Sequence, residues 1–89
     1  MRYKGQFVVR QVVDEIVAVP VGDTAAKFNG MLLLNQASLV IWNCLEQDTS
    51  VDGIVQALTD AFEVSPEEAR TDTLEFLEGL RTADLLEES

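Results

Sequence analysis

The chain has 89 residues, which is enough for one domain with one modest hydrophobic core. Apolar residues make up 47% of it, typical of a folded globular protein, and no apolar run is long enough to span a membrane. The sequence lacks histidine, the commonest general base and transition-metal ligand, and its single cysteine, Cys44, fits a reducing compartment. We therefore expect one cytoplasmic domain over residues 1–89, with no metal, no cofactor and no enzymatic activity.

Charge is unevenly divided along the chain, whose formal net charge is −10. Residues 1–34 carry four basic and three acidic side chains, whereas residues 35–89 carry two basic and thirteen acidic ones. Because an acidic surface repels a phosphate backbone, this balance argues against a nucleic-acid partner. It also predicts that any charged partner of the second half is basic.

The first third of the chain predicts three β-strands. Residues 6–13 and 15–21 are rich in β-branched side chains, and Asp14 between them leaves room only for a tight hairpin, in which we expect Asp14 to take the left-handed turn position. Residues 22–30 are expected to form a loop, because glycine and Asn-Gly bracket them. The run 31–34 is apolar at every position, which favours a third strand that is covered at least in part on both faces.

Three helices are expected in the remainder of the chain, each beginning at a side chain that can cap it. These caps are Asn35, Ser50 and Ser65. After Ser65, a proline at the first helical position and a glutamate at the third form the pattern of a capping box. Trp42 and Cys44 lie on the apolar side of the first of these helices. We expect both to be packed in the core, rather than to serve as a base-stacking platform or a reactive thiol.

The order β-β-β-α-α-α predicts an α+β domain, with a three-stranded antiparallel sheet followed by three helices, close to a winged-helix arrangement. Leu85 and Leu86 are expected to fold back onto the core. In such a meander the third strand is an edge, and residues 29–34 contain no lysine, proline or charge that would block it. Either the run 31–34 is simply a buried core strand, or its edge accepts another strand, with the third helix as the opposite wall of a groove. The residues alone leave both alternatives open.

An ordered set of short motifs in this sequence resembles the PqqD-like family, also called RiPP recognition elements. The set comprises Arg10, VPVG (19–22), FNG (28–30), LN (34–35), IW (41–42) with Leu45, SVDGIVQAL (50–58), FEV (62–64), DTLEFLEGL (72–80) and ADLL (83–86). It spans about residues 7–86. Each motif is weak alone, and the specificity of the resemblance lies in their order.

The resemblance implies a stand-alone peptide chaperone. Such a protein binds the leader of a ribosomally synthesised precursor peptide by strand addition and presents it to a modifying enzyme, often a radical SAM protein. The leader would pair with the third strand and lie against the third helix. The implied peptide-binding residues are Gly30, Met31, Leu32, Leu33, Leu34, Arg70, Thr73, Leu74 and Leu77.

Two positions depart from the pattern of the family that the sequence resembles. Asp14 stands at a turn position where the family often has glycine, which should affect only turn strain. Thr73 stands where an apolar β-branched residue is common. If Thr73 lies in the groove, as the resemblance implies, it alters leader specificity or local packing.

Two other functions remain possible for the same fold. A winged-helix DNA-binding regulator is one, although the third helix is strongly acidic where a recognition helix needs the reverse balance. A structural or dimerisation module is the other, in which the edge of residues 31–34 pairs with its own copy in a homodimer.

Overall fold

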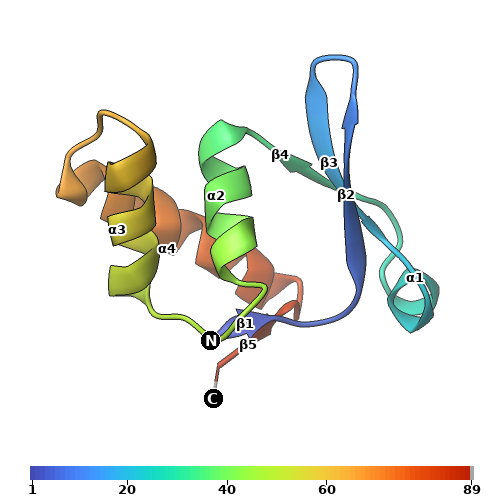
Figure 1. Ribbon diagram of the computed structural model, residues 1–89. Coiled ribbons are helices and arrows are strands. Elements are labelled where there is room, and N and C mark those ends of the chain that lie inside the picture. The colour runs from blue at the N-terminus through green and yellow to red at the C-terminus, as the bar shows by residue number, and fades with distance from the viewer. Residues whose placement is uncertain (89) are drawn as a thin grey trace.

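The computed structural model describes residues 1–88, which fold into one layer of helices beside a small sheet (Figure 1). The strands are β1 (Arg2–Tyr3), β2 (Phe7–Val12), β3 (Glu15–Pro20), β4 (Leu32–Leu34) and β5 (Leu86–Glu87). The helices are α1 (Asp23–Lys27), α2 (Gln36–Cys44), α3 (Val51–Ala61) and α4 (Pro66–Thr82). Strands β2, β3 and β4 form an antiparallel sheet in that order, and α2, α3 and α4 pack together beside it. The predicted α+β class is therefore confirmed, with α1 as an additional short helix.

Alternation along the strands decides which side of the sheet joins the core. In the β3–β4 register, Ile16 lies opposite Leu34 and Ala18 lies opposite Leu32. These four side chains pack into or against the hydrophobic core. Leu33, one position out of phase, points away from it and is 68% exposed.

The hairpin turn differs from the sequence-based expectation in one residue. Val12 pairs with Glu15, so the connection has two residues, and Val13 rather than Asp14 takes the left-handed conformation, with φ 58°. Left-handed backbone is costly for a β-branched side chain, which crowds its own backbone there. Val13 is also 86% exposed at the tip of a hairpin that projects beyond the helices (Figure 1).

The segment 22–30, expected to be a loop, contains the helix α1. Gly22 precedes it with φ 59°, and two alanines in its centre favour a helix over a turn. The Thr24 hydroxyl oxygen accepts a hydrogen bond from the Gln6 backbone N–H at 2.8 Å, which ties α1 to the start of β2. One helical turn is too short to show a periodic apolar pattern, so the sequence did not predict it.

The three predicted helix caps are confirmed. The side-chain oxygens of Asn35, Ser50 and Ser65 accept hydrogen bonds from the backbone N–H three residues further on, at 2.7, 3.1 and 3.1 Å. Of the predicted capping box, only the bond to Ser65 Oγ forms among residues 1–88. These bonds satisfy N–H groups that the first helical turn leaves without partners.

Trp42 anchors the core, as predicted. It is 1% exposed, stacks on Tyr3 with ring centroids 4.1 Å apart, and meets Phe7 edge to face at 5.2 Å. Cys44, on the same helix, packs against the core as expected, although it is only half-buried. Trp42 thus joins the first residues of the chain and the sheet to α2.

The two ends of the described chain meet. β1 pairs antiparallel with β5, with Tyr3 opposite Leu86, in a contact that the sequence did not predict. Leu85 and Leu86 are buried against the core, as expected. The Met1 ammonium group also forms an ion pair with Asp48 after α2. Strands of two residues carry no sequence pattern, and this pairing joins residues that are far apart along the chain.

Candidate functional site: the free edge of β4

The candidate site begins at β4, which is an edge of the three-stranded sheet. β3 occupies one side of β4, and no strand within residues 1–88 occupies the other. Met31 and Leu33 are 57% and 68% exposed, so one face of the run is open where we had expected partial cover on both. The backbone N–H and C=O groups that point away from β3 are available to another strand.

Gly30 gives access to the start of this edge. Its φ is +128°, a conformation that side chains rarely adopt, and a Cβ placed there would meet no atom within 4 Å. The glycine is thus required by the backbone and not by crowding. A peptide strand approaching β4 would meet no side chain at this point.

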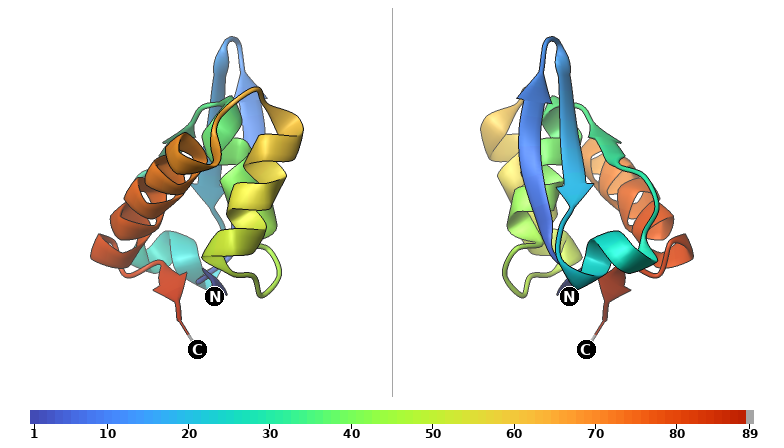
Figure 2. Two further views of the ribbon diagram at one scale, coloured as in Figure 1. Left: turned by 90° about the vertical axis from the view of Figure 1, so that its left-hand side faces the viewer. Right: turned by 90° about the vertical axis from the view of Figure 1, so that its right-hand side faces the viewer.

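Helix α4 lies on the same side of the molecule as the free edge of β4. In both views of Figure 2 the strands follow the order β2, β3, β4, with α4 beyond β4. A cavity of about 330 Å³ begins at Asn35, directly after β4, and lies between α2 and α4. We call this cavity the β4 groove. The cavity is lined by Asn35, Ala37, Ser38, Ile41, Asp72, Glu75 and Phe76.

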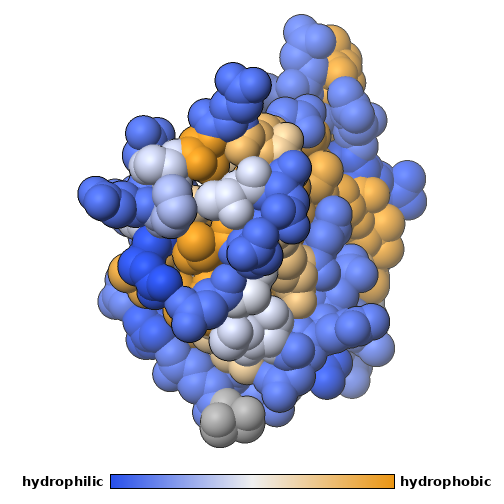
Figure 3. All heavy atoms as spheres, turned by 60° about the vertical axis from the view of Figure 1, so that its left-hand side comes forward, coloured by the Kyte–Doolittle hydropathy of each residue, from blue (hydrophilic) through white to orange (hydrophobic). Residues whose placement is uncertain are grey.

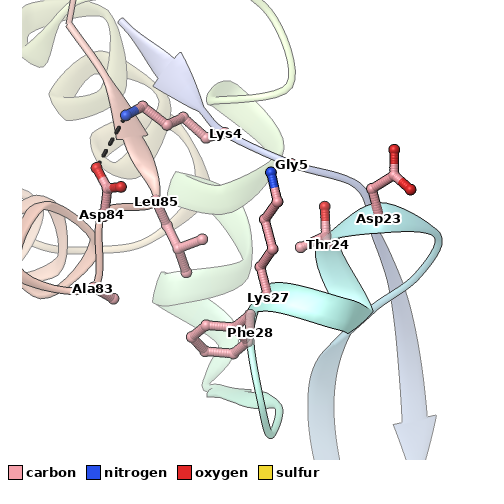
Figure 4. A pocket seen from close by; sticks show the side chains of 9 residues that line it. All are labelled: Lys4, Gly5, Asp23, Thr24, Lys27, Phe28, Ala83, Asp84 and Leu85. Carbon is pink, nitrogen blue, oxygen red and sulfur yellow. Dashed lines mark hydrogen bonds and ion pairs between the residues drawn. The ribbon is translucent and has the colours of Figure 1, made fainter.

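A second cavity, of about 430 Å³, lies between α1 and the turn after α4. Figure 4 shows Lys27 and Phe28 extending from α1 on one side and Leu85 on the other. Lys4 and Asp84 form an ion pair across it at 3.0 Å. Since Asp23 and Lys27 also line this cavity, its formal charges cancel, whereas Asp72 and Glu75 make the first cavity acidic.

The structure does not bring the four helix residues of the predicted site together in the groove. Thr73 and Leu77 are 0% and 2% exposed in the interior. Arg70 turns toward α3, where its guanidinium pairs with the Asp52 carboxylate at 2.6 Å, and Leu74 is 49% exposed. The expectation that Thr73 shapes the groove is not supported by its position, because its hydroxyl donates to the Ala69 carbonyl at 2.7 Å within the buried face of α4.

The α4 residues that line the groove are instead Asp72, Glu75 and Phe76. Successive helical residues are rotated by about 100°, so Asp72 and Phe76, one turn apart, lie beside the buried stripe of Thr73 and Leu77. Phe76 is half-buried, because it packs against the core and also lines the groove. Its spacing of four from Asp72 was the only available sign of a second stripe.

The ionisable groups of the core offer no nucleophile near neutral pH. Burial raises the pKa of the Cys44 thiol, which disfavours the thiolate. Burial and, secondarily, the Glu46 carboxylate raise the pKa of the Tyr3 phenol. Both groups are therefore neutral at physiological pH.

Two further properties concern the part of the chain that the structure describes. Residues 1–88 contain no group of three or more His, Cys, Asp or Glu side chains placed to hold a metal ion. None of the helices in this range combines the length and apolar character needed to cross a membrane.

The fold and the groove define a small α+β module of winged-helix type that presents an open strand edge beside a helix. Comparison of sequences then gives the family: the profile described as coenzyme PQQ synthesis protein D (PqqD) matches residues 15–86, and the chain belongs to this family. The resemblance stated from the motifs is thereby confirmed. No curated protein matches the sequence significantly.

Among solved structures, the chain is similar to one described as TbiB1 in complex with the TbiA(beta) leader peptide. The two share 24% sequence identity and superpose with a TM-score of 0.73. The match covers 100% of this chain and 98% of the other. At this identity the likeness establishes a shared fold over the whole domain.

Proposed function

We propose that this protein binds the leader of a ribosomally synthesised precursor peptide by adding it as a fourth strand to the edge of β4. The observation that carries the proposal is the exposed, apolar, uncharged edge at residues 31–34, which ends at the cavity between α2 and α4. Main-chain hydrogen bonds would provide affinity, and side chains on one face of the added strand would enter the groove and provide specificity. No bond is made or broken by this protein. It acts in the cytoplasm as a stand-alone peptide chaperone that presents the leader to a modifying enzyme, for which a radical SAM protein is our expectation.

Family membership and the structural likeness to a leader-peptide complex support this proposal. The groove itself supports it further, because acidic and apolar side chains stand together around Asp72 and Phe76. A leader with apolar anchors and some basic residues would suit that wall. The strand half of the predicted site, from Gly30 to Leu34, is retained, and we assign the helix wall to Asp72, Glu75 and Phe76.

The charge of α4 disfavours DNA as the partner. The helix carries five acidic side chains, namely Glu67, Glu68, Asp72, Glu75 and Glu78. Its two arginines form ion pairs with carboxylates, Arg70 with Asp52 and Arg81 with Glu78 and Glu88. A recognition helix needs basic groups that are free to meet phosphates.

Pairing between two copies through β4 is a second candidate, because the same open edge favours it. A symmetric dimer would align β4 with its own copy and close both edges at once. Leader binding and dimerisation would then compete for one surface. Sedimentation velocity at rising protein concentration, with and without peptide, measures that competition directly.

The test is a titration of isotope-labelled protein with the leader of a precursor encoded beside its gene. We expect chemical-shift changes at the backbone amides of residues 32–34 and of the α4 residues that line the groove, Asp72, Glu75 and Phe76. Residues at the tip of the β2–β3 hairpin serve as an internal control and should not shift. A leader that binds while leaving residues 32–34 unchanged would refute strand addition at this edge.

A further inference from the structure

A third cavity lies next to the β4 groove and is more apolar than either of the two cavities described above. Its volume is about 420 Å³, and it opens between the first turn of α2, the end of α3 and the beginning of α4. The cavity is lined by Asn35, Gln36, Ala37, Leu58, Phe62, Val64, Ala69 and Asp72. On the side of the helices that Figure 3 turns forward, apolar surface lies between hydrophilic side chains. The volume falls within the range of small-ligand sites, which suits one large side chain of a partner.

This cavity is continuous with the β4 groove. Asn35, Ala37 and Asp72 line both this cavity and the one at the end of β4. Asn35 is also the residue that directly follows β4. A chain that leaves the edge of β4 at Leu34 therefore arrives at the mouth of the apolar cavity.

Strand polarity decides which end of a bound peptide reaches the cavity. The sheet is antiparallel throughout, and purely antiparallel sheets are favoured over mixed ones. A strand added antiparallel to β4 has its N-terminal end beside Leu34 and Asn35. The residues that precede the paired segment of the peptide are thus the ones that meet the cavity.

Charge at the rim specifies the occupant further. Asp72 lies at the boundary of the two cavities and Glu75 in the neighbouring one, and neither forms an ion pair within residues 1–88. No lysine or arginine lines either cavity. A basic side chain on the peptide would be attracted here, next to an apolar one.

From this geometry we infer that the leader carries a second anchor, N-terminal to its strand. It consists of a large apolar side chain that enters the cavity between α2, α3 and α4, and an adjacent basic residue that faces Asp72. This inference rests on the proposed function, because it assumes that the peptide pairs with β4. It adds that recognition depends on the order of elements in the leader: basic and apolar anchor first, strand second.

Two synthetic peptides of identical composition test this order. In one, Arg-Phe is joined through Gly-Ser to the N-terminus of the strand segment Thr-Val-Thr-Val-Thr. In the other, the same elements follow the strand segment. The first peptide should shift the amides of residues 32–34, the Leu58 methyls and the Phe62 ring, and should bind at least about tenfold more tightly than the second, as expected for loss of a buried aromatic anchor.

Variants of the cavity separate its role from that of the strand edge. Ala37→Leu fills the cavity mouth and should reduce the affinity of the first peptide to that of the second. Ala26→Leu, a matched change at an exposed alanine of α1 that lines none of the cavities, should leave both affinities unchanged. Asp72→Asn removes a negative charge while keeping the size of the side chain. It should lower the affinity for the first peptide several-fold and reduce the salt dependence of its binding.

The outcomes distinguish this inference from the proposed function. Suppose that both peptides bind with equal affinity, shift the amide signals of residues 32–34, and leave the signals of Leu58 and Phe62 unchanged. The second anchor is then refuted, and strand addition stands. Tighter binding of the second peptide would refute the inferred polarity, and with it the anchor. If neither peptide shifts residues 32–34, the proposed function fails, and the inference with it.

Discussion

Replacing Thr73 by valine tests whether this residue serves the core or the groove. The side chain is 0% exposed, and its hydroxyl donates at 2.7 Å to the Ala69 carbonyl, which is also the i−4 acceptor of the helix. Removing the hydroxyl therefore leaves no buried polar group without a partner, and valine keeps the volume and has a similar helix propensity. We expect Thr73→Val to change the free energy of unfolding by less than about 1 kcal/mol. Leader affinity should not change, because Thr73 offers no surface to a ligand.

Thr73→Ser is the matched control, because it keeps the hydroxyl and removes the buried methyl group. Loss of that methyl should cost about 1 kcal/mol, since both its transfer energy and the small cavity it leaves count against the fold. For a domain of this size, that corresponds to a melting temperature lower by about 4–8 °C. Urea denaturation followed by circular dichroism measures stability, and the anisotropy of a labelled leader measures binding. Tenfold weaker binding by Thr73→Val at unchanged stability would refute the assignment of Thr73 to the core.

Two further substitutions test the sheet. Leu33→Lys should weaken leader binding by up to about fivefold, because it removes an apolar cross-strand contact worth about 0.2–1 kcal/mol. The free energy of unfolding should stay within about 0.5 kcal/mol of the parent, because the position is exposed. Equal affinity of variant and parent in the anisotropy assay would contradict a strand beside Leu33. Val13→Asn should raise the free energy of unfolding by about 1 kcal/mol in urea denaturation, because asparagine tolerates the left-handed backbone at φ 58° better than valine does. A loss of stability would contradict the left-handed conformation at this position.

Most of the fold was predictable because it depends on local patterns. The β-branched runs of the hairpin, the apolar run of β4 and the three caps at Asn35, Ser50 and Ser65 each act within a few residues along the chain. The β1–β5 pairing was not predictable, since it joins Arg2–Tyr3 to Leu86–Glu87 through contacts that no local pattern encodes. The turn conformation at Val13 was missed because the pairing register, and not residue preference, decides which turn residue becomes left-handed.

The two halves of the candidate site differ in how far the sequence determines them. An edge strand follows from strand order, so Gly30 to Leu34 were predictable from topology. The groove-facing stripe of α4 was not, because a rotation of one residue about the helix axis exchanges Thr73 and Leu77 for Asp72 and Phe76. Only packing against α2 and α3 decides that rotation. The apolar side chain of Phe76 is typical of a core residue in the sequence. In the structure it is half-buried and also lines a cavity.

Because Tyr3 stacks on Trp42, the intrinsic fluorescence of the protein should report on the attachment of β1 and not on the groove. Trp42 is the single tryptophan, lies 1% exposed against the N-terminal strand, and lines none of the cavities described above. Its emission should therefore be nearly insensitive to an occupant of the groove and should respond when β1 detaches from the core. An optical titration would need its chromophore on the peptide, whereas the same tryptophan would report, without any label, how firmly the first residues are held.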